Sequence, residues 1–226
     1  MFEGFFEFVN SLHTREGLEL LIRHGGLTVL IGIIFAETGL LAGFFLPGDS
    51  LLITAGVLSA KSFNGDEPVL NVYSLIITLI VAAVTGDQLG YLLGLKTGPK
   101  IFSRPDSRFF KRKHALAAHS FYERHGGKAL IMARFMPIFR TFVPFIAGVA
   151  TMSYRRFFCF SLLGGTFWVT SITFLGYFIG QSPLGEKLHL VILTVIFLSI
   201  LPMLLGGIRH FYLKKKPLTN LDISAS

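Results

Sequence analysis

Long apolar stretches separated by short polar segments dominate the chain. Residues 27–46 and 69–95 each contain a single charged residue, and residues 157–180 and 188–208 contain none. At about 1.5 Å per helical residue, each of the last three stretches can cross the ~30 Å hydrocarbon core of a bilayer. Residues 51–60 are apolar but too short to span. The pattern predicts an all-α polytopic membrane protein.

Residues 129–154 are also largely apolar, but they do not have the pattern of a plain transmembrane helix. They contain two arginines and two prolines, namely Arg134, Arg140, Pro137 and Pro144. Proline interrupts a helix, and each half of the stretch would cover only about 18 Å as helix. The segment therefore predicts a re-entrant helical hairpin, enclosed by protein because lipid cannot satisfy an interrupted backbone.

Residues 27–60 can be interpreted in the same way, with the turn at Pro47, Gly48 and Asp49. The alternative is that residues 27–46 span the membrane, and the sequence leaves this choice and the side of the N-terminus open. Residues 1–26 are Phe-rich at first and charged later, which predicts an amphipathic helix in the membrane interface.

Short motifs recur in the same order in the two halves of the chain. Residues 23–26 (RHGG), 55–57 (AGV) and 89–91 (LGY) recur as residues 124–127, 147–149 and 175–177. Pro47 and Pro137 lie at comparable places before the AGV motif. If the two hairpins open to opposite sides of the membrane, the repeats are inverted, as in many secondary transporters.

Composition and charge narrow the class of protein. Charged residues make up 15% of the chain and apolar residues 52%, which excludes an ordinary soluble enzyme. The net charge is +8, and the basic residues are concentrated in residues 96–128 and in the tail 209–226. The loops predicted for the other side of the membrane contain only two basic residues, Lys61 and Lys187. This asymmetry places the C-terminus in the cytoplasm and makes nucleic-acid binding the weaker explanation of the charge.

We therefore expect one membrane domain over residues 1–226. Its predicted parts are the N-terminal amphipathic helix 1–26, repeat one at 27–95 with hairpin 27–60, the basic cytoplasmic loop 96–128, repeat two at 129–180 with hairpin 129–154, the last transmembrane helix 188–208 and the basic tail 209–226.

Four charges lie within the predicted hairpins: Glu37 and Asp49 in the first, Arg134 and Arg140 in the second. A charge at the bilayer centre costs about 2.5–3.5 kcal/mol on insertion scales, so we expect pairing or hydration. If the hairpin tips meet, two carboxylates face two guanidiniums. Asp87, inside a predicted span, is a secondary candidate. The cluster could instead be a structural lock, and Asp49 could cap a helix.

The two residue types suit different tasks in transport. Arginine stays charged and its planar fork matches phosphate oxygens, so Arg134 and Arg140 are the candidate phosphate-binding residues. A carboxylate in a water-poor site can bind and release a proton near neutral pH, so Glu37 and Asp49 are the candidates for proton coupling. The predicted turn and packing residues are Pro47, Gly48, Gly56, Pro137, Pro144 and Gly148.

Enzyme chemistry is not predicted. The chain contains one cysteine, no HExxH motif, no GxSxG motif and no nucleotide-binding glycine loop. We expect no cofactor and no bound metal.

Residues 35–39 (FAETG) and 45–52 (FLPGDSLL), followed by Ala55-Gly56, resemble the first signature of the DedA family, also called SNARE-associated or VTT-domain proteins. The family's second signature has a similar counterpart in the second half of the chain, at residues 133–135 (ARF), 140–141 (RT) and 147–148 (AG), together with Pro144. Residues 86–87 (GD) and 175–177 (LGY) also fit, so the resemblance covers about residues 25–210.

The resemblance implies a bacterial inner-membrane protein that depends on the proton motive force. Some family members are implicated in returning undecaprenyl phosphate across the membrane, and eukaryotic relatives are described as lipid scramblases. Residues matching Glu37, Asp49, Arg134 and Arg140 are regarded as required for function.

Three hypotheses follow for the function. The first is a proton-motive-force-dependent flippase of a phosphate-bearing lipid, and the alternative is a proton-coupled antiporter of small cations or drugs. The third is a membrane-shaping scaffold whose charges are structural. The expected partners are membrane lipids and protons, and self-association into a homo-oligomer is left open.

Overall fold

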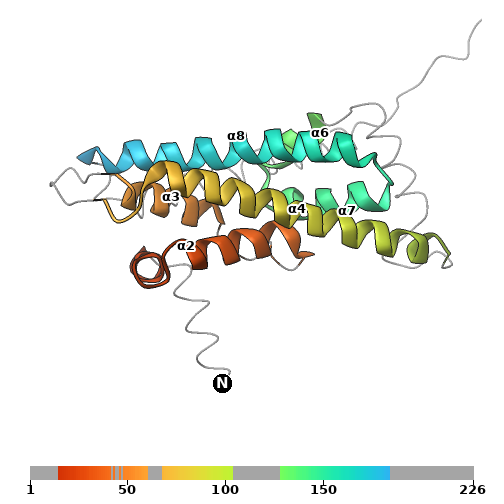
Figure 1. Ribbon diagram of the computed structural model, residues 1–226, viewed down its shortest axis with the longest axis horizontal. Helices are drawn as coiled ribbons and strands as arrows, with labels where there is room; N and C mark the ends of the chain where they lie inside the picture. Colours follow the sequence, from red (N-terminus) through yellow and green to blue (C-terminus); the bar gives the residue numbers. More distant parts are fainter. Residues whose placement is uncertain are drawn as a thin grey trace, which may run out of the picture.

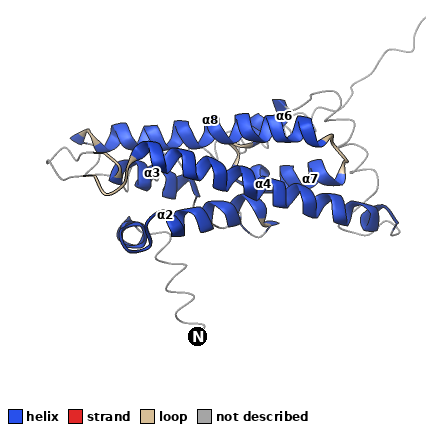
Figure 2. Cartoon of the chain, viewed as in Figure 1, coloured by secondary structure: helices blue, strands red, loops and turns tan. Residues whose placement is uncertain are grey.

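The computed structural model describes residues 15–41, 43, 46, 48–60, 68–103 and 128–183. Within these ranges every regular element is an α-helix, as Figure 2 shows. The helices are α2 (Arg15–Gly39), α3 (Gly48–Leu58), α4 (Val72–Ser103), α6 (Lys128–Ala133), α7 (Pro137–Val149) and α8 (Tyr154–Gly180) (Figure 1). The predicted all-α class is confirmed for this part of the chain. The predictions for residues 1–14, for most of the basic loop and for the helix 188–208 lie outside it.

Among the described residues, two helices are long and apolar enough to cross a membrane. They are Val72–Gly98, within α4, and Tyr154–Gly180, the whole of α8, with 27 residues each. At 1.5 Å per residue each measures about 40 Å. Tyr73, Ile77 and Val81 form an exposed apolar stripe on α4, because residues four apart lie on one face of a helix. Such a stripe is what a lipid-facing surface requires.

Helix α2 changes direction at Gly26, whose backbone is not helical (φ 53°, ψ −149°). The positive φ is readily adopted only by glycine. Figure 1 accordingly shows the first part of α2 end-on, while its second part runs along the long axis of the molecule. The kink coincides with the predicted boundary between the charged segment 1–26 and the apolar segment that follows.

The second part of α2 and the whole of α3 form an antiparallel pair beside α4 and α8 (Figure 1). Gly39, at the end of α2, packs against Gly86 in the middle of α4, where a Cβ on Gly39 would lie 2.9 Å from the Gly86 carbonyl oxygen. Helix α3 then runs back, and the Val69 amide donates to the Leu58 carbonyl at 2.8 Å. The pair therefore reaches only the middle of the bundle.

Helices α6 and α7 form the corresponding pair at the other end of the bundle (Figure 1). They are separated by a turn at residues 134–136, and α7 begins at Pro137. Proline is tolerated at the first helical position because its missing N–H would have no partner there. The break between α6 and α7 thus lies where the sequence predicted one.

Pro144 does not interrupt a helix, which corrects the prediction, although it is a packing residue as the prediction allowed. It lies inside α7, and the helix continues to Val149. Pro144 faces Gly90 of α4, where a Cβ on the glycine would lie 3.2 Å from the proline Cβ. A proline within a helix removes one hydrogen bond, and here the packing of α7 on α4 holds the helix together despite that loss.

Glycines bring the returning arm of each pair into backbone contact with the long helix of the other half. Gly56 of α3 lies against α8, and a Cβ there would be 3.0 Å from the Tyr177 nitrogen and 3.1 Å from the Gly176 Cα. Gly148 of α7 lies against α4, and a Cβ there would be 2.9 Å from the Leu95 nitrogen and 3.0 Å from the Gly94 Cα. Both predicted packing glycines are therefore located at helix–helix contacts.

Candidate functional site

The charged residues singled out from the sequence lie together in the middle of the bundle, where the two helix breaks meet. Glu37 is fully buried, and Asp87, Arg134 and Arg140 are no more than 4% exposed. Asp49 retains 13% of its side-chain exposure. The five residues come from α2, α3, α4, the α6–α7 turn and α7, so only the tertiary fold brings them together.

Arg140 binds both carboxylates of the first helix pair. Its Nη1 lies 2.6 Å from Asp49 Oδ1, and its Nη2 forms an ion pair with Glu37 Oε1. The planar guanidinium suits this arrangement because it presents several donors in fixed directions. Gly48 makes it possible, since a Cβ at that position would collide with the Glu37 carboxylate. The expected meeting of the two carboxylates with a guanidinium is therefore found at Arg140.

Trp168 of α8 completes this cluster, and the sequence analysis did not single it out. Its Nε1 donates to Asp49 Oδ1 at 2.9 Å, and its ring centroid lies 4.8 Å from Arg140 Cζ. The signal that could have found it is that it is the only tryptophan of the chain and lies within an apolar span. A buried indole N–H usually requires a hydrogen-bond acceptor.

Replacing Trp168 with Phe is expected to destabilise the protein by about 1–3 kcal/mol, because a hydrogen bond to a charged group is lost. The cation–π contact with Arg140 is weakened as well. The midpoint of SDS-induced unfolding, followed by far-UV circular dichroism, measures the effect. Phe167→Leu is the matched control because Phe167 is an exposed aromatic neighbour on the same helix. Equal midpoints for the two variants would contradict the assigned role of Trp168.

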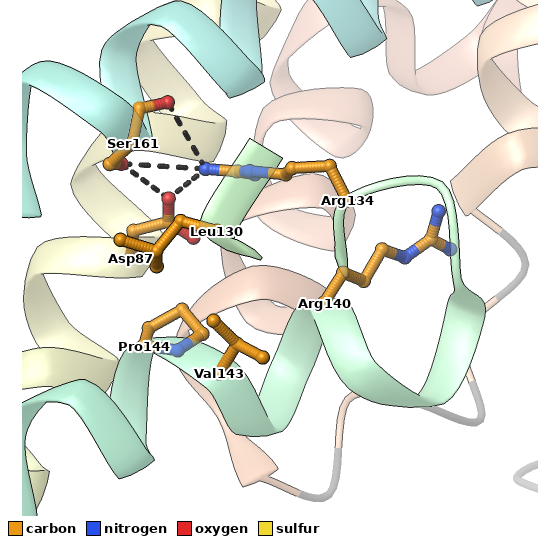
Figure 3. A pocket seen from close by; sticks show the side chains of 7 residues that line it. All are labelled: Asp87, Leu130, Arg134, Arg140, Val143, Pro144 and Ser161. Atoms are coloured by element: carbon orange, nitrogen blue, oxygen red, sulfur yellow. Dashed lines mark hydrogen bonds and ion pairs between the residues drawn. The ribbon is translucent and has the colours of Figure 1, made fainter. Parts of the chain in front are cut away.

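Arg134 belongs to a second cluster and does not contact Glu37 or Asp49 directly. Its Nη2 pairs with Asp87 Oδ2, and the Ser161 hydroxyl of α8 donates to the same carboxylate oxygen. Nη2 also lies 3.4 Å from the carbonyl oxygen of Ser161. Figure 3 shows the guanidinium of Arg134 directed at Asp87 and Ser161, whereas that of Arg140 points away from them. Asp87 is therefore a principal partner, although the sequence ranked it as secondary.

The packing around Arg134 depends on two glycines of α8. A Cβ on Gly164 would lie 3.3 Å from Arg134 Cγ, and one on Gly165 would lie 3.5 Å from its Nη2. Small residues at these positions let the α6–α7 turn approach α8 closely. Ser161 carried no sequence signal beyond its position one turn before this glycine pair.

Several buried atoms of the two clusters have no hydrogen-bond partner within the described part of the chain. They are Glu37 Oε2, Asp87 Oδ1, Arg134 Nη1 and Arg140 Nε. A buried donor without an acceptor is costly, and guanidinium donors match the oxygens of an anion. The same clusters hold carboxylates that can take up protons. Within the described ranges no three His, Cys, Asp or Glu side chains gather to hold a metal ion.

Of the remaining residues predicted for the site, Pro47 lies outside the described residues. Pro144 lines the small cavity beside Asp87 and Arg134 (Figure 3). Gly56 and Gly148 lie at helix contacts away from the charges.

The described part of the chain is all-helical, with membrane-length apolar helices, lipid-suited outer faces and buried charges at interrupted helices. These are the features of an integral membrane protein. More particularly, the chain belongs to the DedA family, because the VTT domain model matches residues 46–178.

Known relatives agree with this assignment. Protein DedA of Escherichia coli (strain K12) is 43% identical over 203 residues, which cover 88% of this chain and 91% of the relative. An uncharacterized membrane protein of Mycobacterium tuberculosis (strain ATCC 25618 / H37Rv) is 43% identical over 190 residues, 82% of each chain. Inner membrane protein YqjA of Escherichia coli (strain K12) is 34% identical over 185 residues, 80% of this chain and 79% of the relative. No solved structure matches significantly.

Proposed function

We propose that this protein is a transporter that uses the proton motive force to move a phosphate-bearing lipid, such as undecaprenyl phosphate, across the bacterial inner membrane. The observation that carries the proposal is a pair of buried arginines with unused donors. Nη1 of Arg134 and Nε of Arg140 have no acceptor among the described residues. A phosphate group supplies such acceptors and matches the guanidinium fork.

The proposed topology is a multi-pass one with two inverted repeats. In it, α2–α3 and α6–α7 are re-entrant hairpins that enter from opposite sides, and the C-terminus is cytoplasmic. Three observations support it: the repeated sequence motifs, the two helix pairs at opposite ends of the bundle in Figure 1, and the matching contacts of Gly56 and Gly148. Discontinuous helices that meet at the midplane are typical of transporter binding sites.

Proton coupling is assigned to Glu37 and Asp49 because both are bound to Arg140. When a phosphate group occupies Arg140, the two carboxylates lose their counter-charge in a site that water hardly reaches. An unpaired buried carboxylate is far less costly when it binds a proton. Substrate binding on one side and release on the other would then carry protons in the same direction.

The test uses the full chain in sealed liposomes that contain undecaprenyl phosphate, and follows how much phosphate is accessible from outside over time. We expect protein-dependent redistribution that a pH gradient biases. Arg140→Lys should lose at least ~10-fold in rate, because the charge is kept but the bidentate fork is lost. Glu37→Gln should lose the bias imposed by the gradient.

Arg155→Lys is the matched control, because Arg155 is an exposed arginine outside the site. Its rate should equal that of the wild type. Each variant is first shown to be inserted and folded by size-exclusion chromatography. Absence of redistribution by the folded wild type would contradict the lipid-transport proposal.

A proton-coupled antiporter of small cations or drugs is the second candidate. It is favoured by the excess of carboxylates among the five charged residues, three against two guanidiniums, and by the unpartnered Glu37 Oε2. Such an antiporter would release protons from liposomes without any polyprenyl phosphate when a cation is added. A pH-sensitive dye in the same vesicles measures this, and a silent dye across a cation panel would dismiss the candidate.

A further inference from the structure

We propose that Asp87 is a third proton-carrying carboxylate of this site, and that it exchanges places with a phosphate oxygen on Arg134. The inference rests on the proposed transport of a phosphate-bearing group. It extends that proposal, which assigns protons only to Glu37 and Asp49, to the second cluster, where Asp87, Arg134 and Ser161 meet.

The pairing of Asp87 with Arg134 leaves half of each group unused. Only Nη2 of the guanidinium and only Oδ2 of the carboxylate take part in their ion pair. Arg134 Nη1 and Asp87 Oδ1 are buried and have no partner among the described residues. A structural Arg–carboxylate lock would be expected to use the bidentate geometry, which satisfies both atoms of each group. The one-sided pairing is suited to exchange with a second acceptor.

The cavity beside this pair indicates how the exchange would proceed. Its polar side is formed by Asp87, Arg134 and Ser161, and Arg140 also lines it with its guanidinium turned away (Figure 3). It has room for about one water molecule, which is too little for a phosphate group. Because a phosphate group does not fit beside Asp87, the proposed step has its oxygen take the place of Asp87 on Arg134 Nη2.

The charge balance then requires a proton. The charged group that faces Asp87 is Arg134 from the α6–α7 turn, while Ser161 from α8 is neutral. Arg140 from α7 also lines the cavity, but its guanidinium is turned away toward Glu37 and Asp49. The five charged residues already include one more carboxylate than guanidiniums. A phosphate monoester adds about 1.5–2 negative charges near neutral pH. With its guanidinium partner taken by phosphate, an ionised Asp87 would be a buried and unpaired charge, which is among the costliest arrangements in a protein.

The proposed step moves one proton and breaks no bond of the phosphate ester. A proton from water forms an O–H bond on the Asp87 carboxylate as Arg134 Nη2 turns to the phosphate oxygen. The neutral carboxyl group then donates a hydrogen bond to the Ser161 hydroxyl, which had been its donor. When the phosphate leaves, Asp87 releases the proton to water and binds Arg134 again.

The test measures proton uptake when the full chain, in lipid nanodiscs, binds farnesyl phosphate, a short prenyl phosphate. Calorimetric titrations in two buffers with different ionisation enthalpies yield the number of protons taken up per bound ligand. Asp87→Asn keeps the shape of the side chain but cannot bind the proton, so we expect about one proton fewer than for the wild type. Ser171→Ala, which removes a half-buried hydroxyl elsewhere on α8, should leave the number unchanged.

An equal proton number for wild type and Asp87→Asn would overturn this inference and leave the proposed function standing. Failure of the wild type to bind farnesyl phosphate would overturn both. Infrared difference spectra give a second measurement that does not depend on the folding of the Asp87 variant. Binding should produce the carbonyl band of a protonated carboxyl group, and Ser161→Ala should shift it, whereas Ser171→Ala should not. A band that is absent, or unshifted in Ser161→Ala, would also overturn the inference.

Discussion

Arg140→Ala is expected to destabilise the folded protein by about 3–5 kcal/mol, the usual cost of breaking a buried ion pair by removing one partner. The loss would be large because Arg140 is bound to both Glu37 and Asp49, and Glu37 is fully buried. Unfolding by SDS, followed through the fluorescence of Trp168, the only tryptophan of the chain, measures the change. The indole of Trp168 lies against Arg140. The emission of the folded Arg140→Ala variant should therefore already differ from that of the folded wild type.

A triple variant separates the structural from the functional part of this effect. Glu37→Gln and Asp49→Asn, combined with Arg140→Met, remove all three charges while keeping similar side-chain volumes. Replacing a buried ion pair by neutral groups is often nearly neutral for stability, so the triple variant should unfold close to the wild-type midpoint. It should still fail to transport. A stable triple variant with normal transport would mean that the cluster is only a structural lock.

Gly148→Ala and Gly56→Ala are expected to cause the second large loss, about 1–3 kcal/mol or more each. A single added carbon would collide with the Tyr91 carbonyl oxygen in the first case and with the Thr173 carbonyl oxygen in the second. Backbone atoms of a packed helix cannot move aside as the end of a flexible side chain can. The arm α7 or α3 would therefore be pushed away from its long helix. The same SDS titration measures both variants.

Gly32→Ala is the matched control for these variants. Gly32 is also a helical glycine, but apart from the backbone of its own turn no described heavy atom lies within 4 Å of the added Cβ. Alanine has the higher helix propensity, so this change should be neutral or stabilise by up to about 1 kcal/mol. If Gly56→Ala and Gly148→Ala behaved like Gly32→Ala, the close helix contacts described above would be wrong.

The sequence predicted the helical class and the position of the breaks well, because both depend on local properties. Spans 69–95 and 157–180 are apolar over a membrane thickness, and they correspond to α4 and α8. The start of α7 follows from Pro137, whose ring favours a first helical position. Pro144 was misjudged, because whether a proline ends a helix depends on what supports that helix from outside.

The sequence predicted which charged residues form the candidate site better than it predicted which of them bind one another. Glu37, Arg134 and Arg140 lie within apolar segments, where a charge is costly to bury. The sequence alone therefore indicates that they need partners. Asp87 was ranked only as a secondary candidate, and Asp49, although a candidate for proton coupling, had a helix cap as its alternative explanation. Ser161 had almost no signal in the sequence, because hydroxyl side chains are common in apolar helices. Trp168 could have been noticed only as the single tryptophan of the chain.

By itself, then, the sequence determined that this is a helical membrane protein with interrupted apolar segments and charges that need partners. Only the tertiary structure decided that Arg140 pairs with Glu37 and Asp49, while Arg134 pairs with Asp87 and Ser161. The physical reason is distance along the chain. These partners are 27 to 103 residues apart, and no local periodicity records which helix faces meet. The close approach of α3 to α8 and of α7 to α4, through Gly56 and Gly148, sets that pairing.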